Sequence, residues 1–147
     1  MYKISNREDI KRYAGNIFRN GLPKGVSTGI PNLDPHYKYR KGELDVIMGL
    51  ANIGKTTTMF YLMLNASVRY NWKWLCYCPE NEPVGDMISD IAEMYVGKSA
   101  DKDRQDRMSA TEFSNAIDWV LDHFTIITFK DQPSATQVLD AFEEQME

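Results

Sequence analysis

One eight-residue stretch of the sequence has the residue types and the spacing of a phosphate-binding turn. Residues 49–56, Gly-Leu-Ala-Asn-Ile-Gly-Lys-Thr, fit the pattern G-x-x-x-x-G-K-[ST]. In this pattern the backbone N–H groups of the turn and the positive end of the following helix converge on phosphate oxygens. With ordinary residue frequencies the pattern arises by chance in about one chain of this length in two hundred. The stretch therefore predicts a nucleotide site.

The residues of the turn have separate expected roles in holding ATP and Mg²⁺. Lys55 is expected to reach the β- and γ-phosphates as a cation, and the Thr56 hydroxyl is expected to ligate Mg²⁺. Glycine at positions 49 and 54 lets the main chain wrap tightly, and Asn52 tolerates a left-handed conformation. The predicted nucleotide-binding residues are Gly49, Leu50, Ala51, Asn52, Ile53, Gly54, Lys55, Thr56 and Thr57, with ATP and Mg²⁺ as ligand and cofactor.

The carboxylate of Glu80 is a second candidate for chemistry, because it follows a predicted strand. Parallel strands place their carboxyl ends along one edge of a sheet, where ligands collect. A carboxylate there can act on the water that attacks the γ-phosphate, as a general base or a positioning group. Position alone leaves two alternatives open. In the first, Glu80 is an exposed loop residue without a catalytic role; in the second, Glu82, two residues further on, acts on the attacking water in its place.

The elements around these residues indicate an α/β fold with a parallel sheet. The runs 44–48, 74–78 and 124–128 are short and apolar, and each is separated from the next by helical material of crossover length. Capping boxes beginning at Ser5, Ser109 and Ser134 predict three helix starts, and the phosphate turn predicts a fourth. Apolar stripes at helical spacing then predict five helices. They run from Glu8 to Gly21, from Lys55 onward, from Asp86 to a stop at Gly97, from Glu112 to about Phe124, and from Thr136 to about Gln145. We expect a loop-rich connector over 21–41 and an exposed loop over 98–108.

Composition narrows the class of protein. The 147 residues carry a net charge of −4, so any contact with DNA is expected to be local or supplied by partners. No apolar run approaches the ~20 residues needed to cross a membrane, and the N-terminus has no apolar signal core. We expect a cytoplasmic protein, without membrane contact, in which Cys76 and Cys78 are ordinary buried thiols and not metal ligands.

Three segments together resemble the RecA-like ATPase core of DnaB-type replicative helicases, including the ring helicases of phages and of the Twinkle type. They are Ser-Thr-Gly-Ile-Pro-Asn-Leu-Asp at 27–34, Lys-Gly-Glu-Leu at 41–44, and the phosphate turn. Pro-Glu-Asn at 79–81 looks like the catalytic-glutamate motif of that family, which favours Glu80 over its rival. The amphipathic helix over 1–21 resembles the linker helix that docks on the neighbouring subunit in such rings, although a helix packed on its own domain explains it equally well.

The resemblance implies an ATP-driven DNA helicase that acts on single-stranded DNA as a homo-oligomer, a hexameric ring, in a bacterial or phage-infected cell. Lys55 and Glu80 would be its catalytic residues. Residues 22–147 would then form the first part of a RecA-like domain, ending before the Walker B strand, the DNA-binding loops and the arginine finger. The chain departs from the family pattern at Ala51 and Asn52, where Pro and Gly are usual.

Two other classes of function remain open on the sequence. One is a stand-alone nucleotide-binding or regulatory module, and the other is a recombinase or clock-type ATPase of the RecA superfamily. The segment Pro-Glu-Asn at 79–81 favours the helicase.

Overall fold

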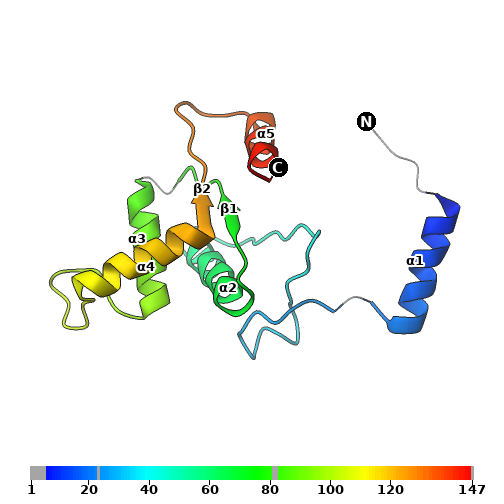
Figure 1. The fold of residues 1–147 in the computed structure, drawn as a ribbon, viewed down its shortest axis with the longest axis horizontal. Helices are drawn as coiled ribbons and strands as arrows, with labels where there is room; N and C mark the ends of the chain where they lie inside the picture. The colour runs from blue at the N-terminus through cyan, green and yellow to red at the C-terminus, as the bar shows by residue number, and fades with distance from the viewer. Residues whose placement is uncertain (1–5, 23, 81–82, 147) are drawn as a thin grey trace. The chain divides into compact units, whose positions relative to one another are not determined.

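The computed structural model describes residues 6–22, 24–80 and 83–146. The chain divides into two compact units, unit 1 (Met1–Val46) and unit 2 (Ile47–Glu147), which are described separately (Figure 1). The elements in chain order are α1 (Arg7–Asn20), α2 (Lys55–Tyr70), β1 (Trp74–Cys76), α3 (Val84–Val96), α4 (Ala110–His123), β2 (Phe124–Ile126) and α5 (Ala135–Met146).

Unit 1 begins with the predicted amphipathic helix, α1. The side chain of Asn6 accepts a hydrogen bond from the backbone N–H of Glu8 and caps the helix, and Gly21 ends it with φ 76°. The predicted cap, Ser5, lies outside the described residues. No residue of α1 is buried. Its apolar stripe is therefore available to a partner.

The remainder of unit 1 is a loop that closes on itself. Val26 and Tyr39 form an antiparallel bridge through backbone N–O distances of 2.9 and 3.1 Å. Between them, Asp34 accepts hydrogen bonds from the hydroxyl of Ser27 and from the backbone N–H and hydroxyl of Thr28. These bonds, that of Ser27 above all, hold the pKa of Asp34 below its ordinary value. The hydrogen bonds of Ser27, Thr28 and Asp34 thus hold this loop together.

Unit 2 contains a two-stranded parallel sheet. Trp74 lies opposite Phe124 and Cys76 opposite Ile126, which confirms the predicted parallel pairing of these two runs. Each strand is two residues shorter than predicted. A connection of only three residues, 71–73, joins α2 to β1, so α2 runs opposite to β1 (Figure 1). The beginning of α2 and the carboxyl end of β1 therefore face the same end of unit 2.

The predicted strand at 44–48 is wrong, because these residues form no regular strand in the structure. Their side chains are largely exposed, with 90% of Leu44, 70% of Val46 and 86% of Met48 accessible. A strand exists only when its backbone pairs with another strand. Among the described residues, the sheet consists of β1 and β2, and 44–48 pairs with neither of them.

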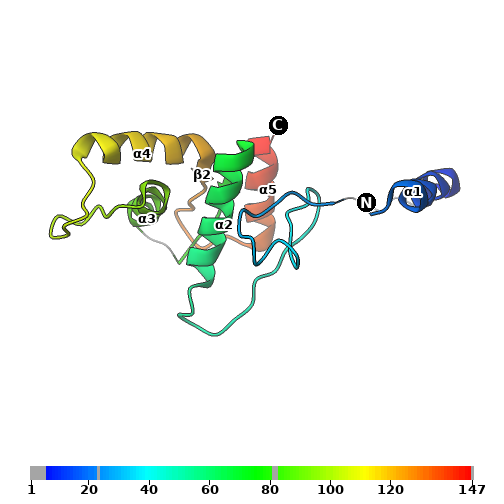
Figure 2. The same ribbon diagram turned by 90° about the horizontal axis from the view of Figure 1, so that it is seen from below.

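Local signals placed the helices of unit 2 correctly. α3 ends at Gly97 with φ 73°, as predicted. Ser109 and Glu112 form the predicted capping box at the start of α4, and Ser134 exchanges the same pair of bonds with Gln137 at the start of α5. Figure 2 shows α3 nearly end-on beside α4, so that the two helices cross. In the described residues, no helix is long and apolar enough to cross a bilayer.

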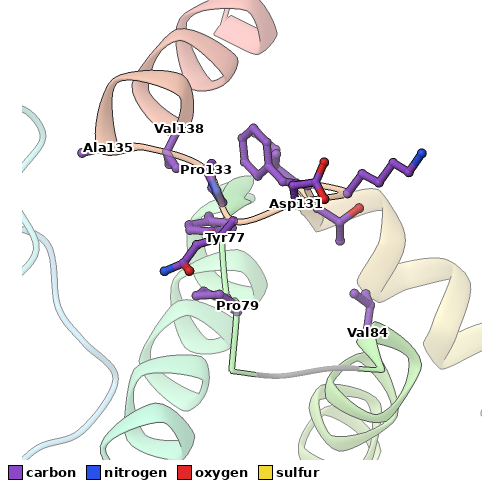
Figure 3. A pocket seen from close by; sticks show the side chains of 13 residues that line it. Tyr77, Pro79, Val84, Asp131, Pro133, Ala135 and Val138 are labelled. Atoms are coloured by element: carbon purple, nitrogen blue, oxygen red, sulfur yellow. The ribbon is translucent and has the colours of Figure 1, made fainter.

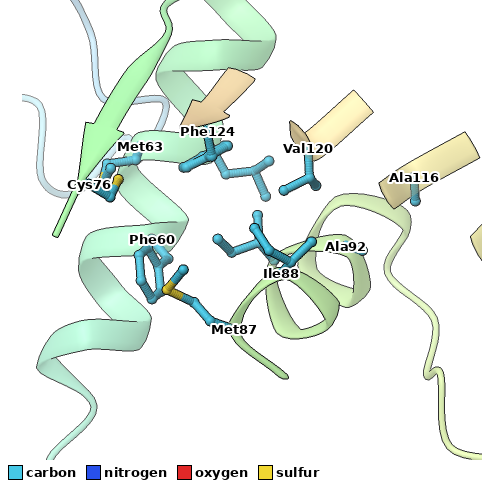
Figure 4. Close-up of a cluster of buried hydrophobic side chains, with 11 residues drawn as sticks. Phe60, Met63, Cys76, Met87, Ile88, Ala92, Ala116, Val120 and Phe124 are labelled. Atoms are coloured by element: carbon cyan, nitrogen blue, oxygen red, sulfur yellow. The ribbon is translucent and has the colours of Figure 1, made fainter. Parts of the chain in front are cut away.

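One hydrophobic core joins α2, α3, α4 and the two strands (Figure 4). Ile91 and Ala92 on α3 and Val120 on α4 are fully buried, and Phe124 of β2 retains only 1% exposure. This core fixes the sheet and the three helices relative to one another. The remaining members are Phe60, Met63, Leu64, Cys76, Met87, Ile88 and Ala116.

Candidate nucleotide site

The phosphate turn has the backbone conformation that its residue types predicted. Gly54 has φ 83° and Asn52 has φ 59°, both in the left-handed region. The predicted left-handed conformation of Asn52 is therefore confirmed. The turn follows a segment without regular secondary structure, where a strand was expected.

The first turn of α2 is open to an anion. Gly54 is its N-cap residue and supplies no side-chain hydrogen bond, so the first backbone N–H groups of the helix have no side-chain acceptor. The ammonium of Lys55 donates to the carbonyl of Leu50 at 2.7 Å, which folds the lysine back over the turn. Thr56 and Thr57 are exposed on the same turn. The first turn of α2 thus combines backbone donors, a cation and exposed threonine hydroxyls, the kinds of group that bind phosphate.

Gly49 allows the turn to wrap closely. A Cβ built on Gly49 would lie 2.5 Å from Cδ1 of Ile53 and 3.4 Å from Cδ of Lys55. The absence of a Cβ at Gly49 thus leaves room for the side chains of Ile53 and Lys55 to lie close to the backbone of the turn.

The groups available for Mg²⁺ are few. No cluster of three or more His, Cys, Asp or Glu side chains suited to a metal ion occurs within residues 6–22, 24–80 and 83–146. Mg²⁺ in nucleotide sites takes one or two protein ligands and otherwise binds water and phosphate. The hydroxyl of Thr56 can supply such a single protein ligand. The described residues offer no cluster that would hold Mg²⁺ through protein groups alone.

Glu80 follows the carboxyl end of β1, as expected from the sequence. It is exposed, and it lies at the end of unit 2 where α2 begins. Asn81 and the rival Glu82 lie outside the described residues. The structure thus brings Glu80 and the phosphate turn to the same end of one unit.

A cavity of about 600 Å³ opens at the carboxyl ends of β1 and β2 (Figure 3). One wall follows β1 and includes Tyr77 and Pro79, while the opposite wall follows β2. Figure 3 shows Val84, the first residue of α3, and Asp131 on the far side of the opening from Pro79. The cavity is also lined by Cys78, Ile127, Thr128, Phe129, Lys130, Gln132, Pro133, Ala135 and Val138.

The loop that follows β2 was not among the predicted site residues. Thr128, Lys130, Asp131 and Gln132 supply most of the polar groups of the cavity. The rule that ligands collect at the carboxyl ends of parallel strands pointed to Glu80 after β1 and applies equally to the residues after β2.

The two cysteines lie at and beyond the end of β1. Both are free thiols, and Cys76 is buried as predicted, whereas Cys78 is only half-buried. Burial raises the pKa of Cys76 to about 12 and also raises the pKa of Cys78. Both thiols therefore stay protonated and unreactive at neutral pH.

The chain is similar to the Twinkle homolog protein, chloroplastic/mitochondrial, of Arabidopsis thaliana. The two are 34% identical over 109 residues, which cover 71% of this chain and 15% of that relative. No protein-family model and no solved structure matches the chain. The chain thus spans about one seventh of the length of the relative, and the match supports a relationship to Twinkle-type, DnaB-like helicases at the level of the family.

Proposed function

We propose that this chain is the ATP-binding part of a DnaB-like replicative DNA helicase with a RecA-like core. The observation that carries the proposal is the phosphate turn, in which the left-handed Asn52 and Gly54 lead into an uncapped helix and Lys55 folds over the cradle. The similarity to the Twinkle homolog supports the helicase class. Single-stranded DNA and a homo-oligomeric, hexameric ring are the partners that this class implies.

Each residue of the site then has one task. The backbone N–H groups of the turn and the ammonium of Lys55 bind the phosphate oxygens, and the hydroxyl of Thr56 ligates Mg²⁺. Mg²⁺ supplies charge neutralisation on the phosphates when it is bound. Glu80 orients a water molecule for attack on the γ-phosphate and accepts its proton.

The proposal is tested by titrating the chain with Mg-ATP in a calorimeter. Lys55→Ala should abolish binding, because it removes the cation that contacts the phosphates. The variant should keep its fold, because Lys55 is not part of the hydrophobic core. Lys73→Ala is the matched control, since Lys73 is exposed in the connection between α2 and β1 at the opposite end of α2, and it should bind as wild type. Equal affinity of wild type and Lys55→Ala would refute the site.

A further inference from the structure

The cavity of Figure 3 has the size of a site for an organic ligand. At about 600 Å³ it is far larger than a single ion or phosphate needs and lies within the ~300–1,000 Å³ range typical of ligand pockets. It opens at the carboxyl ends of both strands, on the end of unit 2 where the phosphate turn also lies. The phosphate turn itself contributes no residue to its lining.

Its walls suit a flat aromatic guest. Tyr77 and Phe129 meet edge to face, with ring centroids 5.4 Å apart and an interplanar angle of 89°. In this arrangement the edge of one ring meets the face of the other. The ring that presents its edge therefore has both of its faces uncovered by its neighbour. Pro79, Val84 and Val138 add further apolar surface, and Figure 3 shows the first two on opposite sides of the opening.

Its polar groups are concentrated in one short loop. Lys130, Asp131 and Gln132 succeed one another along the lining. Within the described part of the chain, these three side chains form no hydrogen bond or ion pair with another protein group. An acceptor, an amide that both donates and accepts, and one cation thus line this side of the cavity. With one positive and one negative side chain, these three residues have no net charge, so they suit recognition of a neutral group such as a base through shape and hydrogen bonds.

We propose that this cavity binds the planar base of a nucleotide, with the ring packed against Tyr77 or Phe129 and its polar edge facing Asp131 and Gln132. The inference rests on the proposed function, since two sources of a base follow from it: the ATP held at the phosphate turn, or a single-stranded nucleic acid. Pro79 lines the cavity and precedes Glu80 directly.

The test compares three ligands on the intact chain: Mg-ATP, Mg-tripolyphosphate and a twelve-residue oligodeoxythymidylate. Phe129→Ala removes one aromatic wall, and Phe113→Ala is the matched control because Phe113 is a half-buried residue of α4 outside the cavity. Loss of stacking on one base should weaken binding at least about fivefold. If the base of ATP occupies the cavity, Phe129→Ala weakens Mg-ATP and leaves Mg-tripolyphosphate unchanged. If nucleic acid occupies it, only the oligonucleotide is weakened.

Gln132→Ala, with the exposed Gln105→Ala as its control, repeats the test without touching the aromatic wall. Wild-type affinity of both Phe129→Ala and Gln132→Ala for Mg-ATP and for the oligonucleotide would overturn the inference, as would a wild-type chain that binds neither. Failure of the proposed function is recognised separately. In that case Lys55→Ala would bind Mg-tripolyphosphate as wild type, or wild type would not bind it at all, whatever the result with the oligonucleotide.

Discussion

At the phosphate turn, Gly54 and Gly49 are glycines for different physical reasons. Gly54 has φ 83°, which strains any L side chain whatever the space around it. Gly49 is required only by contact, and the group nearest to its absent Cβ is the end of the Ile53 side chain. Ile53 is 61% exposed and can rotate away.

We therefore expect Gly54→Ala to be the more harmful substitution. A left-handed alanine costs about 1–2 kcal/mol, so the affinity for Mg-ATP should fall by roughly 5- to 30-fold. Gly49→Ala should stay within about threefold of wild type, because rotation of Ile53 relieves the contact at small cost. Calorimetric titration of both variants gives the two affinities for Mg-ATP. If Gly49→Ala bound more weakly than Gly54→Ala, the turn would bind ATP in another conformation.

Protonation of the Glu112 carboxylate affects the stability of the start of α4. Its hydrogen bond from Lys98, followed by those from the backbone and side chain of Ser109, lowers the pKa of Glu112 from 4.5 to about 2. A carboxyl whose pKa is lowered by folding stabilises the folded state fully above its unfolded pKa. That stabilisation is lost as the pH falls from about 4.5 through 2.

At the scale of the element, we expect this loss to appear as a weaker cap on α4. Urea unfolding at pH 5 and at pH 3 should show a smaller pH-dependent loss of stability in Glu112→Gln than in wild type. Glu143→Gln on the exposed side of α5 is the matched control and should follow wild type. Parallel pH dependence in wild type and Glu112→Gln would show that the Lys98 and Ser109 bonds do not form in solution.

The helices of the chain were predictable because their signals are local. The glycine stop at Gly97 and the capping boxes beginning at Ser109 and Ser134 each lie within a few residues of the bond they make. The strand ends were predicted less well, because pairing stops at Cys76 and Ile126 although the apolar runs continue. The continuing residues Tyr77 and Ile127 instead line the cavity.

At the scale of the whole molecule, the apolar stripe of α1 is exposed. Ile10 is 55% exposed and Tyr13 60% exposed, and no residue of the helix is buried. The resemblance of α1 to a linker helix makes a second copy of this chain the expected partner.

A double substitution, Ile10→Glu with Tyr13→Glu, tests this expectation by light scattering after size exclusion. We expect the oligomeric mass to fall while each chain keeps its fold, because neither side chain is buried within the single chain. Arg12→Gln, on the face of the helix opposite Ile10, should keep the wild-type mass. A wild-type monomer, or an unchanged mass in the double variant, would exclude α1 as the contact between copies.

The sequence by itself determined features whose causes lie within a few residues: the presence of the helices, the capping boxes at Ser109 and Ser134, the left-handed Asn52 and the spacing of the phosphate turn. The cap of α1 was not among them, because Asn6 caps this helix and the prediction had named Ser5. Tertiary structure alone decided that 44–48 has no strand partner, that the loops after β1 and β2 enclose a cavity, and that His123 contacts Asn71 at 3.0 Å across 52 residues of sequence. The physical reason is the range of the interactions. A helix closes its hydrogen bonds between residues four apart, whereas a strand, a cavity wall and a cross-chain hydrogen bond each need a partner whose position only the folded core supplies.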